Sequence, residues 1–297
     1  MLPEGPLDTG VVARPQAPPS AEPATRAVAL LPRGVGDVVD TAIALYRRNA
    51  KLLIGTVAVV FVPVEFLSAF LNRNLFTQIH QLISSLQTSA QTGVPPSGRQ
   101  FSNPLASLLL VVAAPLLFAA ITAAAASSYL GRPMTVGQAW RASLRRFWGV
   151  LGLGILYALI VGFGTLFFVV PGIFLSIQLL VSMAALIVES AGPTTALDRS
   201  WRLVRRCWWR TFGVAVLAGL LYAFLIYLVV LPSYVLGFFA GGFGWLIVAV
   251  GTTLAQVVIV PLFAVAVVVD YFDLRIRKEA FDLAVSAQHL QALPAVP

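Results

Sequence analysis

The sequence predicts an all-α integral membrane protein with six transmembrane helices, and three observations lead to this fold class. The 297 residues are 59% hydrophobic and only 11% charged, whereas soluble domains carry about 25% charged residues. The apolar residues fall into long blocks, which is typical of membrane spans. The basic residues, finally, lie almost entirely in segments that an even number of spans would place on one side of a membrane.

Four apolar blocks supply the six spans. A helix needs about 20 residues to cross the hydrocarbon core, so the two shorter blocks supply one span each and the two longer blocks supply two each. The longer blocks carry turn residues near their middles, namely Pro171-Gly172 in one and the segment AGGFG at 240–244 in the other. The four blocks are 52–71, 104–130, 149–188 and 212–269.

The distribution of charge predicts the orientation. With six spans, the basic residues before the first span, at 131–148, at 189–211 and after the last span share one side, and only Arg73 and Arg99 lie on the other. The positive-inside rule places the basic side in the cytoplasm. We therefore expect a multi-pass protein with both termini inside, and we attribute the formal charge of +8 to this topology.

The membrane domain is expected at 33–283, with a short tail on each side. Residues 1–32 are rich in proline and alanine and lack the features of a signal peptide, so they predict a disordered cytoplasmic tail. Residues 284–297 form a cytoplasmic C-terminal tail. The outer loop, 72–103, contains the segment LFTQIHQLISSL, whose apolar stripe predicts a short helix on the outer leaflet. We expect a structural role for His80 in this segment.

Three segments share one pattern, in which paired arginines come just before an apolar span. The segments are 34–55, 131–152 and 192–213, and their pairs are Arg47-Arg48, Arg145-Arg146 and Arg205-Arg206. Each segment predicts a cytoplasmic amphipathic helix that leads into a transmembrane hairpin. The chain is therefore expected to consist of three such repeats.

The third segment gives the strongest candidate site. At 100° per residue, Trp201 and Trp208 fall on one side of a helix and the arginines on the other, while Pro193 suits the first turn with Gly192 or Thr194 as the cap. Helices of this kind place aromatic rings at headgroup depth and guanidinium groups near phosphates. The candidate lipid- or phosphate-binding residues are Arg141, Arg145, Arg199, Arg202, Arg205, Arg206 and Arg210, and the interfacial aromatic residues are Trp140, Trp201 and Trp208.

These arginines have a simpler interpretation as topology determinants and interfacial anchors, and the sequence leaves it open. A nucleic-acid partner is excluded, because the basic residues are spread at membrane depth and no nucleic-acid-binding motif accompanies them.

Glu65 is the second candidate, because it lies about 14 residues into the first span, roughly 20 Å from the inner surface. Carboxylates inside a membrane are costly and usually face a cavity or a partner. Either Glu65 reaches toward the outer interface beside Pro63, or it serves a proton or cation pathway. Glu189 and Asp270 end spans at the cytoplasmic side and are expected to pair with neighbouring arginines.

The sequence shows none of the motifs G-x-x-x-x-G-K-[ST], H-E-x-x-H, G-x-S-x-G or C-x-x-C. Its two histidines are isolated, and its single cysteine, Cys207, cannot form an intramolecular disulfide. We therefore expect no catalytic residue, no metal ligand and no cofactor. The glycine pair Gly162 and Gly164 lies inside a span and indicates close helix packing.

A resemblance to a known family rests on three segments. The segment VPGIFLSIQLLVSMAALIVESAGPTTALDRSWRLVRRCWWRTFGV resembles the hallmark region of the glycerophosphoryl diester phosphodiesterase membrane-domain family. RGVGDVVDTAIALYRRNAKLLIG and YFDLRIRKEAFDL resemble the entry and exit of its actinobacterial members. The resemblance implies a bacterial cytoplasmic membrane. In some relatives a soluble phosphodiesterase barrel follows, but its metal-binding carboxylates and histidines have no counterpart here, so we expect no such activity.

Two functional hypotheses follow. In the first, the protein is not an enzyme and engages anionic lipid, or organises a membrane protein partner, through its arginine- and tryptophan-rich helices. In the second, it is a transporter or flippase-like permease for an amphiphile or an ion and uses Glu65. An enzyme ranks third, because no catalytic constellation is visible.

Overall fold

The computed structural model describes residues 34–71 and 104–279, and its elements are helices joined by short turns. Six helical segments in these ranges are long and apolar enough to cross a membrane, as the sequence predicts. The predicted tails at 1–32 and 284–297 and the outer helix with His80 lie outside the described residues.

The six long segments match the predicted spans in number and order. Five of them are mainly one long helix each, and the remaining one joins α7 to α8. Their bounds are α2 (Ala50–Leu71), α4 (Pro104–Tyr129), α6 (Phe147–Phe167), α7 (Val169–Gln178), α8 (Ser182–Val188), α10 (Trp208–Phe239) and α11 (Gly244–Glu279).

Three shorter helices each come directly before a long one. They are α1 (Val35–Arg48) before α2, α5 (Val136–Leu144) before α6 and α9 (Pro193–Val204) before α10. The arginine pairs lie where the short helix ends and the long helix begins, so each pair sits at a corner of the chain.

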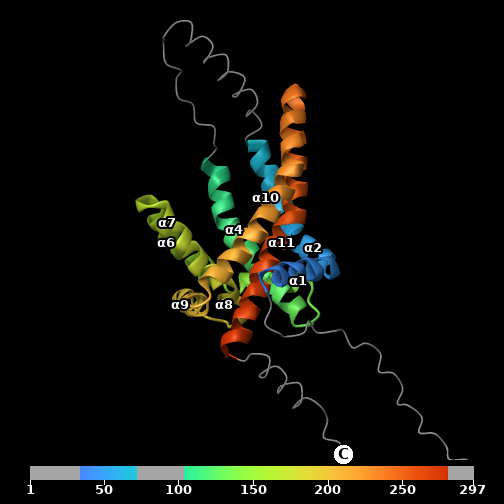
Figure 1. The fold of residues 1–297 in the computed structure, drawn as a ribbon. Helices are drawn as coiled ribbons and strands as arrows, with labels where there is room; N and C mark the ends of the chain where they lie inside the picture. Colours follow the sequence, from blue (N-terminus) through green and yellow to red (C-terminus); the bar gives the residue numbers. More distant parts are fainter. Residues whose placement is uncertain (1–33, 72–103, 280–297) are drawn as a thin grey trace, which may run out of the picture.

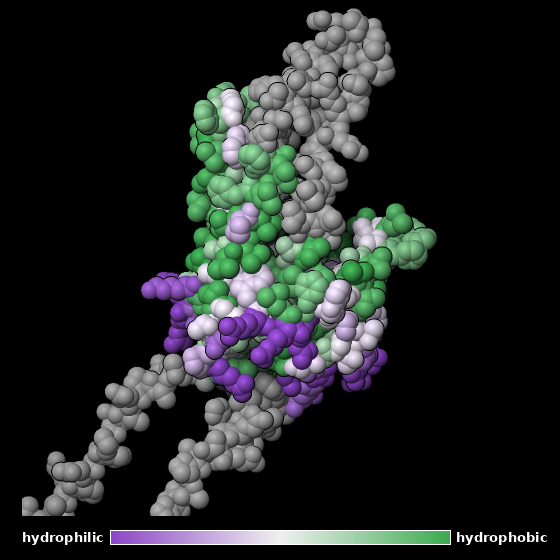
Figure 2. Space-filling model, turned by 180° about the vertical axis from the view of Figure 1, so that it is seen from behind, coloured by the Kyte–Doolittle hydropathy of each residue, from purple (hydrophilic) through white to green (hydrophobic). Residues whose placement is uncertain are grey.

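The longest helix, α11, is the centre of the arrangement, and it packs against α1, α2, α4, α8, α9 and α10. Figure 1 shows α10 and α11 as a long hairpin, with α2 and α4 beside it and the α6–α7 hairpin leaning away. Helices α1 and α9 and the last turns of α11 lie together at the lower end, which we call the charged end. Figure 2 shows hydrophilic residues gathered around this end and hydrophobic surface above it.

The buried core lies near the charged end. Tyr271 and Phe272 of α11 are fully buried, and the Phe272 ring stacks on Tyr129 of α4 with ring centroids 4.5 Å apart. Away from this end large apolar side chains are exposed, for example Leu166 at 81% and Phe239 at 80%. This distribution matches a bundle whose upper part faces lipid, where apolar surface needs no burial in protein.

The two predicted breaks within the long blocks have different outcomes. The break at 240–244 is confirmed, since a 3-10 turn, η1 (Gly241–Phe243), joins α10 to α11, and Gly241 adopts a φ of +59° that suits glycine. The break predicted at Pro171-Gly172 is wrong in position, because the chain turns at Phe168, which is extended with φ −155° and ψ 139°. Pro171 then falls in the first turn of α7, where its missing N–H costs nothing.

An interruption at 179–181, between α7 and α8, has no signal in the sequence. The buried Gln178 amide donates to the Trp201 carbonyl at 2.9 Å, and the Ser200 hydroxyl donates to the Gln178 carbonyl at 2.9 Å. Because both partners belong to α9, a tertiary contact ends α7 at this point.

Glycines hold the two hairpins close. A side chain at Gly164 would meet Leu175 at 2.8 Å, which confirms the predicted close packing there, whereas Gly162 faces open space, so the prediction is wrong for that residue. In the α10–α11 hairpin, a side chain at Gly251 would overlap Ser233.

Gly251→Val is therefore expected to lower the free energy of unfolding by about 1–3 kcal/mol, as overpacking does in close-packed interiors. The control is Gly219→Val on α10, where an added Cβ meets open space. Unfolding by SDS titration, followed by circular dichroism, compares the two variants. Equal unfolding midpoints would contradict the close packing of the hairpin.

Candidate functional site

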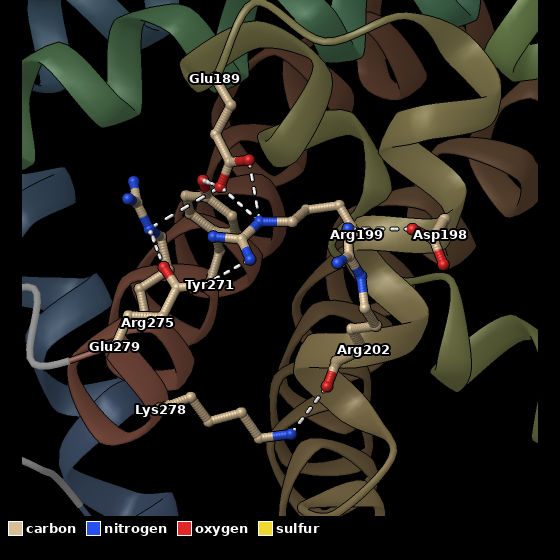
Figure 3. Close-up of polar contacts among 8 residues, drawn as sticks. All are labelled: Glu189, Asp198, Arg199, Arg202, Tyr271, Arg275, Lys278 and Glu279. Carbon is tan, nitrogen blue, oxygen red and sulfur yellow. Dashed lines mark hydrogen bonds and ion pairs between the residues drawn. The ribbon is translucent and has the colours of Figure 1, made fainter.

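Two ion-pair networks occupy the charged end, and the first has Arg199 of α9 at its centre (Figure 3). The Arg199 Nε donates to the Glu189 carboxylate at 2.8 Å, and its terminal nitrogen pairs with Glu279. The Tyr271 hydroxyl donates to Glu189 at 2.7 Å, and Arg275 pairs with Glu279 at 3.1 Å. This network joins the end of α8, the middle of α9 and the last turns of α11.

The Arg199 side chain is only 19% exposed. Burial by itself lowers the pKa of this guanidinium, but hydrogen bonds to Glu279 and Glu189 outweigh the burial and raise the pKa above its ordinary value. Arg199 therefore stays charged at every pH at which the fold persists. The expected pairing of Glu189 with a neighbouring arginine is confirmed.

The second network joins α10 to α11 through Arg210. Its guanidinium pairs with Asp270 at 2.8 Å and with Asp273 at 2.6 Å, and Asp273 also pairs with Arg277 at 2.7 Å. Both aspartate side chains are almost completely buried, at 0% and 1% exposure. A buried carboxylate without a partner is strongly unfavourable, so Arg210 is needed where it lies. The expected pairing of Asp270 with an arginine is confirmed.

The predicted helix of the third segment is too long. Helix α9 ends at Val204 and α10 begins at Trp208, so one apolar face cannot run from α9 through Trp208. The start of α9 is as expected, with Gly192 as the N-cap and Pro193 in the first turn.

The buried face of α9 is not centred on the side where the sequence places Trp201. It consists of Ala196, Ser200, Leu203 and Val204, whereas Trp201 is 37% exposed at its edge. Three of these four residues are smaller than leucine, which allows the helix to approach α8 closely. Helix α9 is therefore docked on the bundle.

Two of the predicted interfacial tryptophans pack against neighbouring helices. The Trp140 indole N–H donates to the Thr56 carbonyl of α2 at 2.9 Å. The Trp208 ring stacks on Phe174 of α7, with a centroid distance of 5.5 Å, and on Phe212 of its own helix at 5.1 Å.

Two other tryptophans are the most exposed ones. Trp148 and Trp209 are 82% and 78% exposed, and each is the second residue of its long helix, α6 or α10. In the sequence, both tryptophans come just after an arginine pair. Their exposure can be predicted from this position only when the boundary between the short and the long helix is known.

The structure divides the seven candidate arginines into two groups. Arg199 and Arg210 are held in the networks, and Arg202 pairs with Asp198 at 2.9 Å in an exposed contact. The other four are exposed, and none of them forms an ion pair with a residue in the described ranges. These four are Arg141, Arg145, Arg205 and Arg206.

A groove of about 780 Å³ lies between α7 and the corner where α9 meets α10. Aromatic side chains form much of its apolar wall, and two of the exposed arginines belong to its lining. We call it the basic groove, and its chief residues are Arg205, Arg206, Phe174, Trp208, Trp209 and Phe212. The first N–H groups of a helix lack acceptors within that helix and carry partial positive charge, so the start of α10 adds to the positive potential here.

A second cavity, of about 550 Å³, lies beside Glu65 between α2, α4, α10 and α11. Tyr222 and Gln256 also line it, and the Tyr222 hydroxyl lies 3.4 Å from the Gln256 side-chain oxygen. No ion pair joins Glu65 to a lysine or arginine of the described chain. Glu65, Tyr222 and Gln256 thus form a small polar region in the wall of an otherwise apolar cavity.

Within residues 34–71 and 104–279, no group of three or more histidine, cysteine, aspartate or glutamate side chains is arranged to hold a metal ion. Both histidines lie outside these ranges. The expectation that the chain has no catalytic residue, metal or cofactor therefore stays a prediction.

Arg199→Gln is expected to destabilise the protein by about 2 kcal/mol, because it removes partly buried charged hydrogen bonds to Glu189 and Glu279 and leaves Arg275 as their remaining arginine. Arg202→Gln is the matched control, since its pair with Asp198 is exposed and such pairs contribute less than about 1 kcal/mol. Unfolding by SDS titration measures both changes. If the two variants unfold at the same SDS fraction, the network is not what holds α9.

Comparison of the chain with protein-family models, with curated proteins and with solved structures gives no match. The resemblance to the glycerophosphoryl diester phosphodiesterase membrane-domain family therefore stays a prediction.

Proposed function

We propose that the chain is a multi-pass protein of a bacterial cytoplasmic membrane that binds an anionic lipid in the basic groove. The proposal rests on one observation: a single groove has an apolar aromatic wall and also contains Arg205 and Arg206. An anionic lipid matches both parts, because its phosphate accepts hydrogen bonds from guanidinium groups and its acyl chains contact the aromatic wall.

The surroundings of the groove support a position at the headgroup layer. Trp209 lies in the groove wall and is largely exposed, and tryptophan side chains concentrate at membrane interfaces. Helix α7 forms one wall of the groove, and the α6–α7 hairpin leans away from the rest of the bundle (Figure 1).

The proposed membrane topology places the charged end in the cytoplasm, and it includes the three predicted repeats. In each repeat a short surface helix and an arginine pair lead into a long helix, and the chain then returns through α4, through α7 and α8, or through α11. The order of the described elements supports this division. Both termini then lie in the cytoplasm.

Single cysteines test this topology in a Cys207→Ser background. Gly137→Cys and Gly242→Cys both introduce a thiol at an exposed glycine with open space around it. In intact cells a membrane-impermeant maleimide is expected to label position 242, and to label position 137 only after the cells are permeabilised. The opposite pattern would contradict the orientation.

Lipid binding is tested with the double variant Arg205→Gln/Arg206→Gln. Each arginine near an anionic bilayer surface contributes about 1 kcal/mol, so the loss of both is expected to weaken the binding of phosphatidylglycerol about 30-fold. Native mass spectrometry of the detergent-solubilised protein measures the bound lipid during a titration, with the zwitterionic lipid phosphatidylcholine, which has no net charge, as the comparison.

The control for this experiment is Arg47→Gln/Arg48→Gln, which removes the same charge at the corner between α1 and α2. Arg47 and Arg48 are exposed but do not line the basic groove. An equal loss of phosphatidylglycerol binding in both double variants would show general attraction to the surface and overturn the groove as the site.

The alternative function, a transporter or permease for an amphiphile or ion, is favoured by one specific observation, the cavity beside Glu65. Transporters commonly place their substrate sites near the middle of the bilayer between internal repeats. Glu65 lies fifteen residues after the start of α2, about 22 Å along the helix at 1.5 Å per residue.

A further inference from the structure

The cavity beside Glu65 combines one carboxylate with aromatic walls. Glu65 is half-buried within an apolar segment of α2, and an intramembrane carboxylate in its charged form requires a counter-charge or strong hydrogen bonds. Four aromatic side chains from four helices surround the same space, namely Phe61, Phe118, Tyr222 and Phe263. Aromatic faces attract cations, most strongly where water is excluded.

The charges around the cavity favour a cation. Its described lining contains Glu65 as the one charged residue, and its other polar side chains are Tyr222 and Gln256. The Gln256 side-chain oxygen, which lies beside the Tyr222 hydroxyl, is an acceptor that an ammonium group can use. With Glu65 ionised, the potential inside the cavity is negative.

The size of the cavity favours an organic cation. Another cavity, of about 310 Å³ and mostly apolar, shares the lining residues Ala114, Phe118 and Phe263 with the cavity beside Glu65. The two cavities are therefore neighbours. Together they offer one acidic position and a longer apolar space. Ca²⁺ requires about six to eight oxygen ligands, and the described lining supplies far fewer, so an inorganic divalent ion does not suit this cavity.

We propose that the cavity beside Glu65 binds an organic cation with an apolar body, such as a lipophilic amine or a phosphonium ion. Glu65 supplies the counter-charge, the aromatic side chains contact the cationic centre, and the neighbouring apolar cavity receives the rest of the molecule. The assignment is independent of lipid binding in the basic groove. It names a ligand class for the alternative transport function.

The test measures equilibrium binding of radiolabelled tetraphenylphosphonium to the full chain in nanodiscs of phosphatidylglycerol. The parent protein is expected to bind it saturably, and Glu65→Gln to weaken the affinity by about tenfold or more, as the loss of one charge contact in a poorly hydrated site does. Glu65→Asp, which keeps the charge, is expected to retain most of the binding. Asp198→Asn removes an exposed carboxylate elsewhere and is expected to change nothing.

A Glu65→Gln protein that binds with the parent affinity would overturn the assignment, and so would a parent protein without saturable binding. An unchanged SDS unfolding midpoint for Glu65→Gln shows that a loss of binding is not a loss of fold. Repeating the titration with phosphatidylethanolamine in the nanodiscs separates two sources of the cation. If phosphatidylethanolamine competes with tetraphenylphosphonium, the natural ligand is a lipid with an amine headgroup. If it does not compete, the natural ligand is a free organic cation, and either result supports a cation site.

Binding and transport are measured separately. Saturable binding without uptake into proteoliposomes keeps the cation site and contradicts the transport function. Binding of phosphatidylglycerol through Arg205 and Arg206 is read in its own experiment, so the failure of one proposal does not affect the other.

Discussion

Carboxylates in the last turns of α11 determine where the charged helices lie. Asp270, Asp273 and Glu279, together with Glu189 at the end of α8, face four guanidinium groups from α9, α10 and α11. A buried carboxylate is tolerated only with such partners, so α9 and α10 must place Arg199 and Arg210 against α11. The consequence is that these two arginines hold the fold together, while the chain between α9 and α10 turns outward and exposes its arginine pair.

The same end of the bundle is the one that is tightly packed. Ion pairs, the stacked rings of Tyr129 and Phe272, and the side-chain hydrogen bonds of α9 all lie there. Toward the other end the helices are in contact at glycines within each hairpin and through a small apolar cluster of Ile226, Ala255 and Ile259. In the proposed membrane position, helices gain little from burying apolar surface, which is consistent with spaces between the hairpins. The cavity beside Glu65 is one of these spaces, whereas the basic groove lies at the corner between α9 and α10.

Features that depend on local composition could be predicted from the sequence. They include the six apolar segments, the turn at 240–244, the first turn of α9, and the pairing of Glu189 and Asp270 with arginines. The corner after Val204 could not, because helical periodicity continues through it. The ion pairs of Arg210 near the start of α10 are made to Asp270 and Asp273, which lie 60 or more residues away. The interruption after Gln178 likewise depends on Ser200 and Trp201 of another helix.

Helix α11 connects the two candidate sites, which lie at different depths and carry opposite charge. Gln256 lines the acidic cavity, and Asp270 anchors the helix that forms the basic groove. Between them lies Pro261, which cannot complete the helical hydrogen bond at its position. The Tyr46 hydroxyl of α1 donates to the nearby Val258 carbonyl at 2.8 Å. Pro261 therefore interrupts the hydrogen-bond ladder of α11 between the ion pair at Asp270 on one side and the hairpin contact at Gly251 on the other.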